Sequence, residues 1–135
     1  MAIVIVVLDA SVLIAFFNGH DTHHPEANRL LAEAAGDDLV VSSLTLAELL
    51  VGPARGDEVD STVEALARLE IDEERFPDDV AVQLARLRAE TGLKTPHCCV
   101  LLAAQTAGAE SVGTFDGRLA HEAKTKGLKV VGFQP

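Results

Sequence analysis

Residues 3–11 read IVIVVLDAS, and this stretch decides the fold class. The run from Ile3 to Leu8 is apolar and mostly β-branched, and it has no polar face. Such a run is typical of a strand in a parallel sheet that is buried on both faces. Asp9 ends the run, and Ser11 is expected to cap a short apolar helix that extends to Phe17.

The rest of the chain alternates between helical and strand patterns. Further strands are expected at 39–41, around 71, at 111–115 and at 128–133, and helices at 25–36, from 43 or 45 to 52, at 57–69, 77–89, 97–107 and 118–126. No hairpin signal joins the strands. The alternation therefore predicts an α/β protein whose parallel sheet is connected by right-handed crossovers and covered on both faces.

Composition limits the classes of protein that the chain can belong to. The 135 residues fit one domain spanning 1–135, and the net charge of −10 argues against a non-specific nucleic-acid binder. The chain has five Phe and no Trp or Tyr, which argues against aromatic platforms that stack bases. The adjacent Cys98 and Cys99 cannot form a disulfide framework and are expected to be small core residues in a reducing compartment.

No stretch of the sequence predicts a membrane span, because the apolar N-terminal region is interrupted by Asp9. No basic region precedes that stretch either, so it does not resemble a secretory signal. The expected location is the cytoplasm, with no membrane partner.

Two predicted strands end in an aspartate, Asp9 after IVIVVL and Asp116 after SVGTF. Because the carboxyl ends of parallel strands share one edge, both carboxylates are expected in the crevice where strand order reverses. Mg²⁺ and Mn²⁺ bind through a few carboxylates of this kind. Glu48, on the mainly apolar TLAELL segment, is either solvated or a third member. Taken singly, each aspartate is more often a turn or helix cap and the glutamate a solvated side chain.

Four segments occur in an order that resembles the PIN-domain family, and within it the VapC toxins of bacterial toxin–antitoxin pairs. The segments are LDASVLIAF, TLAELL, LKTPHCCVLLAA and TFDGRL, and the resemblance covers essentially the whole chain. It implies a three-layer α/β/α sandwich with a mainly parallel central sheet. It also implies an endoribonuclease dependent on Mg²⁺ or Mn²⁺, with RNA as substrate, a VapB-like antitoxin as partner and a homodimeric assembly.

The resemblance also assigns residues to the site. Asp9, Glu48 and Asp116 match three of the four acidic positions, and the hydroxyl residues Ser11 and Thr114 match those beside the two aspartates. By that resemblance the aspartates would hold the metal, Glu48 would hold it or orient water, and Ser11 would position a metal-bound water. Thr114 is expected to contact substrate.

The fourth acidic position departs from the family pattern, because His97 stands there, directly after Pro96. A neutral imidazole carries no charge to offset a divalent ion, and it prefers softer metals than Mg²⁺. Three readings stay open: His97 binds Mn²⁺ or Zn²⁺, it contacts a substrate phosphate when protonated, or it marks a degenerate site that only binds.

Two further clusters have both a functional and an ordinary interpretation. Arg118, two residues after Asp116, and the group Lys124, Lys126 and Lys129 could guide RNA, or the lysines could be a solvated helix end. The second cluster consists of His20, Asp21, His23 and His24. Its spacing is unlike that of a standard zinc motif, which favours an ordinary polar loop before a helix.

Overall fold

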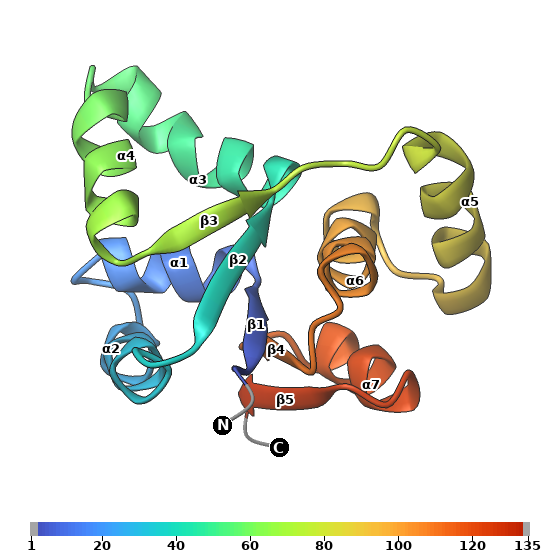
Figure 1. The fold of residues 1–135 in the computed structure, drawn as a ribbon. Coiled ribbons are helices and arrows are strands. Elements are labelled where there is room, and N and C mark those ends of the chain that lie inside the picture. The colour runs from blue at the N-terminus through green and yellow to red at the C-terminus, as the bar shows by residue number, and fades with distance from the viewer. Residues whose placement is uncertain (1–2, 134–135) are drawn as a thin grey trace.

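In the computed structural model, which describes residues 3–133, five strands alternate with seven helices (Figure 1). The strands are β1 (Ile5–Leu8), β2 (Asp38–Ser42), β3 (Ile71–Glu74), β4 (Ser111–Thr114) and β5 (Lys129–Gly132). The helices are α1 (Ala10–Phe17), α2 (His24–Glu33), α3 (Ser43–Arg55), α4 (Val59–Arg68), α5 (Val80–Thr91), α6 (Thr95–Ala107) and α7 (Gly117–Thr125).

The strands form one parallel sheet in the order β3-β2-β1-β4-β5. From β1 the chain builds outward through β2 and β3, then returns to the other side of β1 to build β4 and β5. Strand order therefore reverses between β1 and β4, where Leu8 is in register with Gly113. This arrangement confirms the predicted α/β class and puts the expected ligand crevice directly after Leu8 and Thr114.

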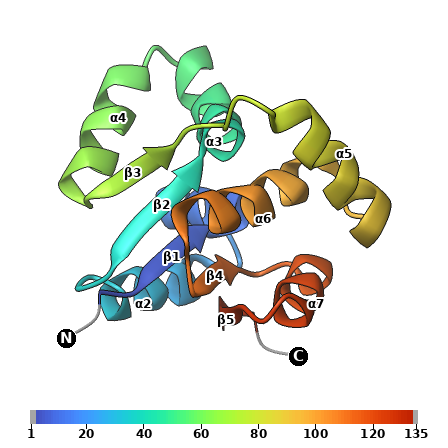
Figure 2. The ribbon, with the colours of Figure 1, turned by 45° about the vertical axis from the view of Figure 1, so that its right-hand side comes forward.

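Helices cover both faces of the sheet. Figure 1 shows α1–α4 on one side and α5–α7 on the other, and Figure 2 shows α6 crossing the middle strands. Val6 and Leu8 pack into the core beneath α1–α4, whereas Val7 between them packs into the core beneath α5–α7. Both faces of β1 are thus buried, which is why its sequence is apolar without alternation.

The N-terminus of α3 lies one residue earlier than predicted. Ser42, rather than Ser43 or Thr45, caps the helix, and its hydroxyl accepts from the amides of Leu44 and Thr45. The prediction that the helix stops at 52–53 is wrong, since it continues to Arg55 with a proline inside. That proline stands in the last turn, where few further helical bonds depend on it.

Other boundaries also shift by two or three residues. Asp9, not Ser11, occupies the N-cap position of α1, so Ser11 lies within the first helical turn. Helix α5 begins at Val80 rather than at Pro77. None of the helices in residues 3–133 combines the length and apolarity that a bilayer crossing requires.

Candidate active site

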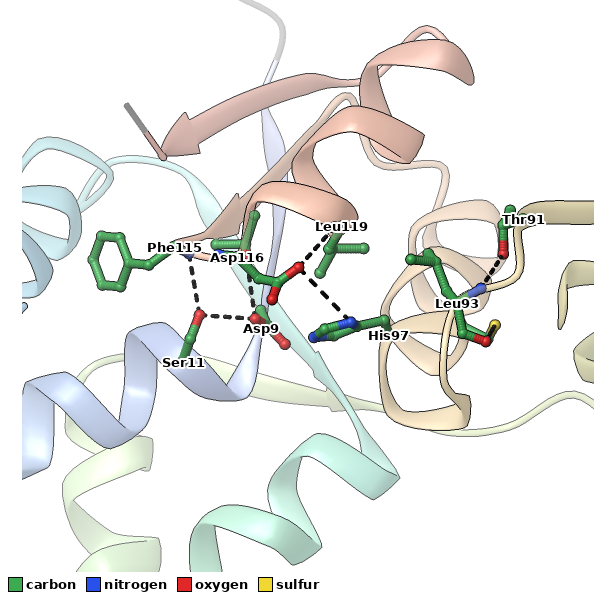
Figure 3. A network of polar contacts seen from close by, with 10 residues as sticks. Asp9, Ser11, Thr91, Leu93, His97, Phe115, Asp116 and Leu119 are labelled. Atoms are coloured by element: carbon green, nitrogen blue, oxygen red, sulfur yellow. Dashed lines mark hydrogen bonds and ion pairs between the residues drawn. The ribbon is translucent and has the colours of Figure 1, made fainter. Parts of the chain in front are cut away.

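Asp9 follows β1 at the switch point and is almost completely buried, with 4% of its surface exposed. One of its carboxylate oxygens, Oδ2, accepts hydrogen bonds from the hydroxyls of Ser11 at 2.7 Å and Thr114 at 2.9 Å. Figure 3 shows the other oxygen on the side of the carboxylate that faces His97. The two hydroxyls therefore fix the orientation of the carboxylate and leave the other oxygen on the side of His97.

The same hydroxyls tie the β1–α1 connection to the β4–α7 connection (Figure 3). The Thr114 hydroxyl accepts from the amide of Asp116 at 3.0 Å, and the Ser11 hydroxyl accepts from the amide of Phe115 at 3.1 Å. Each hydroxyl both donates and accepts, which satisfies it in the interior. The fully buried Thr114 thus positions Asp9 and Asp116 rather than presenting a surface for substrate.

Asp116 caps a helix and also lies beside His97, another predicted site residue. It is the N-cap of α7, and its Oδ1 accepts from the amide of Leu119 at 2.9 Å. The same Oδ1 lies 3.9 Å from Nδ1 of His97, on the first turn of α6. The Asp116 side chain remains 38% exposed and that of His97 26% exposed, so solvent and ligands can reach both.

Glu48 lies on α3, and its side chain is exposed. Desolvation raises the pKa of its carboxyl, the nearby Asp9 carboxylate raises it further, and His97 opposes the shift. Asp9 and His97 are thus charged groups that act on the Glu48 carboxyl, whose side chain is exposed and lines a hollow with Ile14 and Asn18.

The chemistry of this donor set suits a divalent cation. Asp9, Glu48 and Asp116 supply hard carboxylate oxygens, and His97 supplies an imidazole nitrogen. As the side chains stand, however, no three His, Cys, Asp or Glu groups among residues 3–133 are placed to hold one ion. Binding would therefore require a side chain such as that of the exposed Glu48 to turn inward.

The cationic residues divide into two groups. Arg118 lies in the first turn of α7 and lines a hollow with Asp116, His121 and Leu93, next to the carboxylates. Lys124 and Lys126 lie at the opposite end of that helix. A 2.5 Å ion pair joins Lys126 to Glu90. Lys124 and Lys126 thus lie away from Asp116 and His97, Lys129 begins β5, and Arg118 is a cation beside Asp116.

The polar loop 20–24 is a structural turn. Its Asp21 side chain accepts from the amide of His23, and Nδ1 of His24 bonds to the carbonyl of Ala15 at 2.7 Å. The His23 ring stacks on Phe115, with centroids 4.8 Å apart and planes 18° from parallel. Sequence reasoning missed this contact, because the two residues lie far apart in the chain.

The cysteines of α6 are core residues, as predicted. Both thiols are buried, and that of Cys98 donates to the carbonyl of Leu93 at 3.5 Å. Burial, aided by Cys98 and Glu48, raises the pKa of the Cys99 thiol to about 11. Such a thiol is protonated at neutral pH and is neither a nucleophile nor a ready metal ligand.

Several solved structures share this fold, and some of them are described as toxins or toxin–antitoxin complexes. The chain is similar to a toxin–antitoxin complex from Klebsiella pneumoniae, with 28% identity, a TM-score of 0.74 and coverage of 93% of this chain and 95% of that one. It shares its fold with the sarcin–ricin loop cleaving toxin VapC20 of Mycobacterium tuberculosis, with 21% identity, a TM-score of 0.69 and coverage of 87% and 94%. VapBC2 from Rickettsia felis, bound to a promoter DNA fragment, gives 21% identity, a TM-score of 0.66 and coverage of 96% and 99%.

No curated protein matches the sequence significantly. The family comparison is specific, since residues 6–124, which run from β1 to the last turn of α7, match the PIN domain. The matched region includes every side chain of the site described above. The chain therefore belongs to the PIN-domain family.

Proposed function

We propose that this PIN domain is a metal-dependent endoribonuclease and acts as the toxin of a VapBC-type toxin–antitoxin pair. The observation that carries the proposal is the buried network joining Asp9, Ser11, Thr114 and Asp116 across the switch point. Burying a carboxylate is costly unless it is hydrogen-bonded. A network that orients Asp9 through one oxygen and leaves the other on the side of His97 favours a binding or catalytic role over a purely structural one.

A divalent cation, Mg²⁺ or Mn²⁺, would lower the pKa of a bound water and offset the charge that grows on phosphate oxygens. Asp9 and Asp116 are the proposed ligands, and Glu48 acts at the same centre as a ligand or as the group that orients the attacking water. His97 beside Asp116 is the fourth member of the site, and the Ser11 and Thr114 hydroxyls hold Asp9 in place.

The proposed substrate is RNA. An acidic protein repels a polyanion over long distances, so binding must depend on local groups. Arg118 is exposed on the first turn of α7 beside Asp116, where it can contact a phosphate next to the cut bond. Few phosphate contacts of this kind suit recognition of a defined RNA better than a non-specific hold.

The toxin role rests on similarity. The Klebsiella pneumoniae structure is a toxin–antitoxin complex, and VapC20 is described as cleaving the sarcin–ricin loop. The similarity spans nearly the full length of both chains in each case. We therefore propose a VapB-like antitoxin as partner, a homodimeric assembly and a cytoplasmic location for this chain.

A second function follows from His97. It stands where the family pattern has an aspartate, and residues 3–133 hold no ready three-ligand cluster. Both observations favour a PIN-like module that binds RNA or a partner with weak catalysis or none. This alternative predicts that His97→Asp raises metal affinity and creates or increases cleavage.

The test compares RNA cleavage by the wild type, Asp9→Asn and the control Asp72→Asn, which makes the same charge change on the exposed edge strand β3. Melting curves establish that each variant is folded. We expect the wild type and Asp72→Asn to cut RNA in Mn²⁺ or Mg²⁺, and EDTA or Asp9→Asn to stop cleavage. Cleavage that survives both would overturn the proposed mechanism, and absence of cleavage by a folded wild type would favour the binding module.

A further inference from the structure

A small hollow of about 190 Å³ lies beside the proposed active site and plays no part in the mechanism above. It opens at the carboxyl ends of β4 and β5, where Thr114 and Gly132 form the last pair of the register. The aromatic residues that follow these two, Phe115 and Phe133, both line it. The complete lining is His23, Glu26, Phe115, Gly132 and Phe133.

The aromatic walls are held in place by close packing. The ring of His23 stacks on that of Phe115. Gly132 has φ +99°, and a Cβ there would stand 3.1 Å from Cε1 of Phe115 and 3.0 Å from the carbonyl of Thr114. The β5 backbone can therefore press against the Phe115 ring only because this residue is glycine.

The second aromatic wall lies against the helix that begins at the site. A Cβ at Gly117 would stand 3.2 Å from Cζ of Phe133, so the Phe133 ring covers the backbone of the first residue of α7. Asp116 is the residue directly before Gly117. The hollow is thus bounded on one side by the segment that carries a proposed catalytic carboxylate.

Hydrogen bonds couple the hollow to the carboxylates. The Phe115 amide donates to the Ser11 hydroxyl, which in turn donates to Asp9. Figure 3 shows the Phe115 ring extending away from these contacts, on the side opposite His97. The hollow and the Asp9–Asp116–His97 crevice therefore flank the same short stretch of backbone at one edge of the sheet.

We propose that this hollow binds one unpaired base of the RNA substrate, next to the phosphodiester bond that the site cuts. The inference rests on the proposed nuclease function and adds a base-recognition site to it. Unpaired bases bind proteins by stacking on aromatic side chains, and His23, Phe115 and Phe133 supply the rings. The hollow accommodates one base, for which these rings suffice although the chain has few aromatic residues.

Glu26, at the rim of the hollow, indicates which base the hollow would bind. Its carboxylate is exposed at the rim and, when ionised, only accepts hydrogen bonds. Guanine presents two adjacent donors on its Watson–Crick edge, which match the two oxygens of a carboxylate. Uracil places acceptors on both sides of its single donor, so it is disfavoured. The hollow therefore selects guanine.

A binding experiment tests the site without any cleavage. We titrate ¹⁵N-labelled protein in EDTA with GMP and with UMP, and follow the backbone amide signals. GMP is expected to shift the signals of His23 and Phe115 and to bind more tightly than UMP. Phe133→Ala should weaken GMP binding about 5- to 150-fold, the range for loss of one stacked base.

Variants on the rim separate recognition from folding. Glu26→Gln lies on an exposed position of α2 and should remove the preference for GMP over UMP while the melting temperature stays unchanged. Glu33→Gln, two turns along the same helix and also exposed, is the matched control and should keep that preference. Phe133→Leu preserves bulk and distinguishes loss of stacking from loss of fold.

Cleavage mapping on a randomised single-stranded RNA pool connects the hollow to the reaction. The wild type should enrich guanine at one fixed position from the cut, and Glu26→Gln should lose that enrichment while still cutting. GMP that shifts no signal around the hollow, or an enrichment that Glu26→Gln retains, would overturn the inference. If GMP binds in the hollow but the wild type cuts no RNA, the base site stands and the nuclease proposal fails.

Discussion

The hydroxyl of Thr114 offers the sharpest test of how the site is held together. It is fully buried, donates to Asp9 Oδ2 at 2.9 Å and accepts from the Asp116 amide at 3.0 Å. Thr114→Val keeps the shape of the side chain and removes both hydrogen bonds. The network described above therefore predicts that this variant loses stability without creating a cavity.

The size of the loss follows from the groups involved. A hydrogen bond to a charged group contributes about 1.5–3 kcal/mol, and an amide left without its partner adds to the loss. Because Asp116 is partly exposed, water can partly replace the bond from its amide to the Thr114 hydroxyl. The free energy of unfolding is therefore expected to fall by about 2–3 kcal/mol. With an unfolding entropy of about 2.1 cal/mol/K per residue over 135 residues, the melting temperature should fall by about 7–11 °C.

The assay is thermal unfolding in EDTA, followed by circular dichroism. Thr106→Val is the control, because its hydroxyl donates to the Leu102 carbonyl of the same helix on an exposed face and its loss should cost under about 0.5 kcal/mol. In an Asp9→Asn background Thr114→Val should cost about 1 kcal/mol less, because the charged acceptor is gone. A melting temperature within about 1 °C of the wild type, or equal losses in both backgrounds, would refute this account of the network.

Other consequences can be measured on the same protein. Asp9→Asn should lower the pKa of Glu48, which an NMR titration measures. Because this pKa is raised in the wild-type fold, ionisation of Glu48 lowers the free energy of unfolding as pH rises from 4.5 through the raised value. In Asp9→Asn this loss of stability should be smaller. An unchanged Glu48 pKa would contradict the proximity of the two carboxyls. Cys99, with a pKa of about 11, should resist alkylation at pH 8 in the native protein and react in urea, as mass spectrometry would show. Gly113→Ala should cost about 1–3 kcal/mol in a urea titration, since its Cβ would stand 2.9 Å from Leu8 Cδ2; a neutral result would mean that β1 and β4 are packed less closely.

The fold class could be predicted from the sequence because the patterns that indicate its strands and helices are local. The uninterrupted apolar run of β1 reports burial on both faces, and that burial is observed for Val6 and Val7. Helix ends were less accessible. The α3 boundaries depend on whether Ser42 or a neighbour turns its hydroxyl to the first amides and on how the last turn accommodates Pro53, and composition does not determine either.

The arrangement of the candidate site could be predicted from the sequence only in part. The meeting of Asp9 and Asp116 at one sheet edge follows from parallel topology, and their shared hydroxyl partner Thr114 agrees with it. The stacking of His23 on Phe115 depends instead on tertiary packing between α2 and the β4–α7 connection, which leaves no local pattern. The roles of the site residues in binding metal and RNA stay predictions, because they concern groups outside the chain.

The central claim is that Asp9, Glu48 and Asp116 serve one shared cation. Anomalous diffraction from a crystal soaked in Mn²⁺ tests it directly. The account predicts one anomalous peak in the crevice, within ligand distance of the free Asp9 oxygen and of Asp116, with Glu48 turned towards it. A saturated soak with no peak there, or with peaks only at surface carboxylates elsewhere, would contradict it.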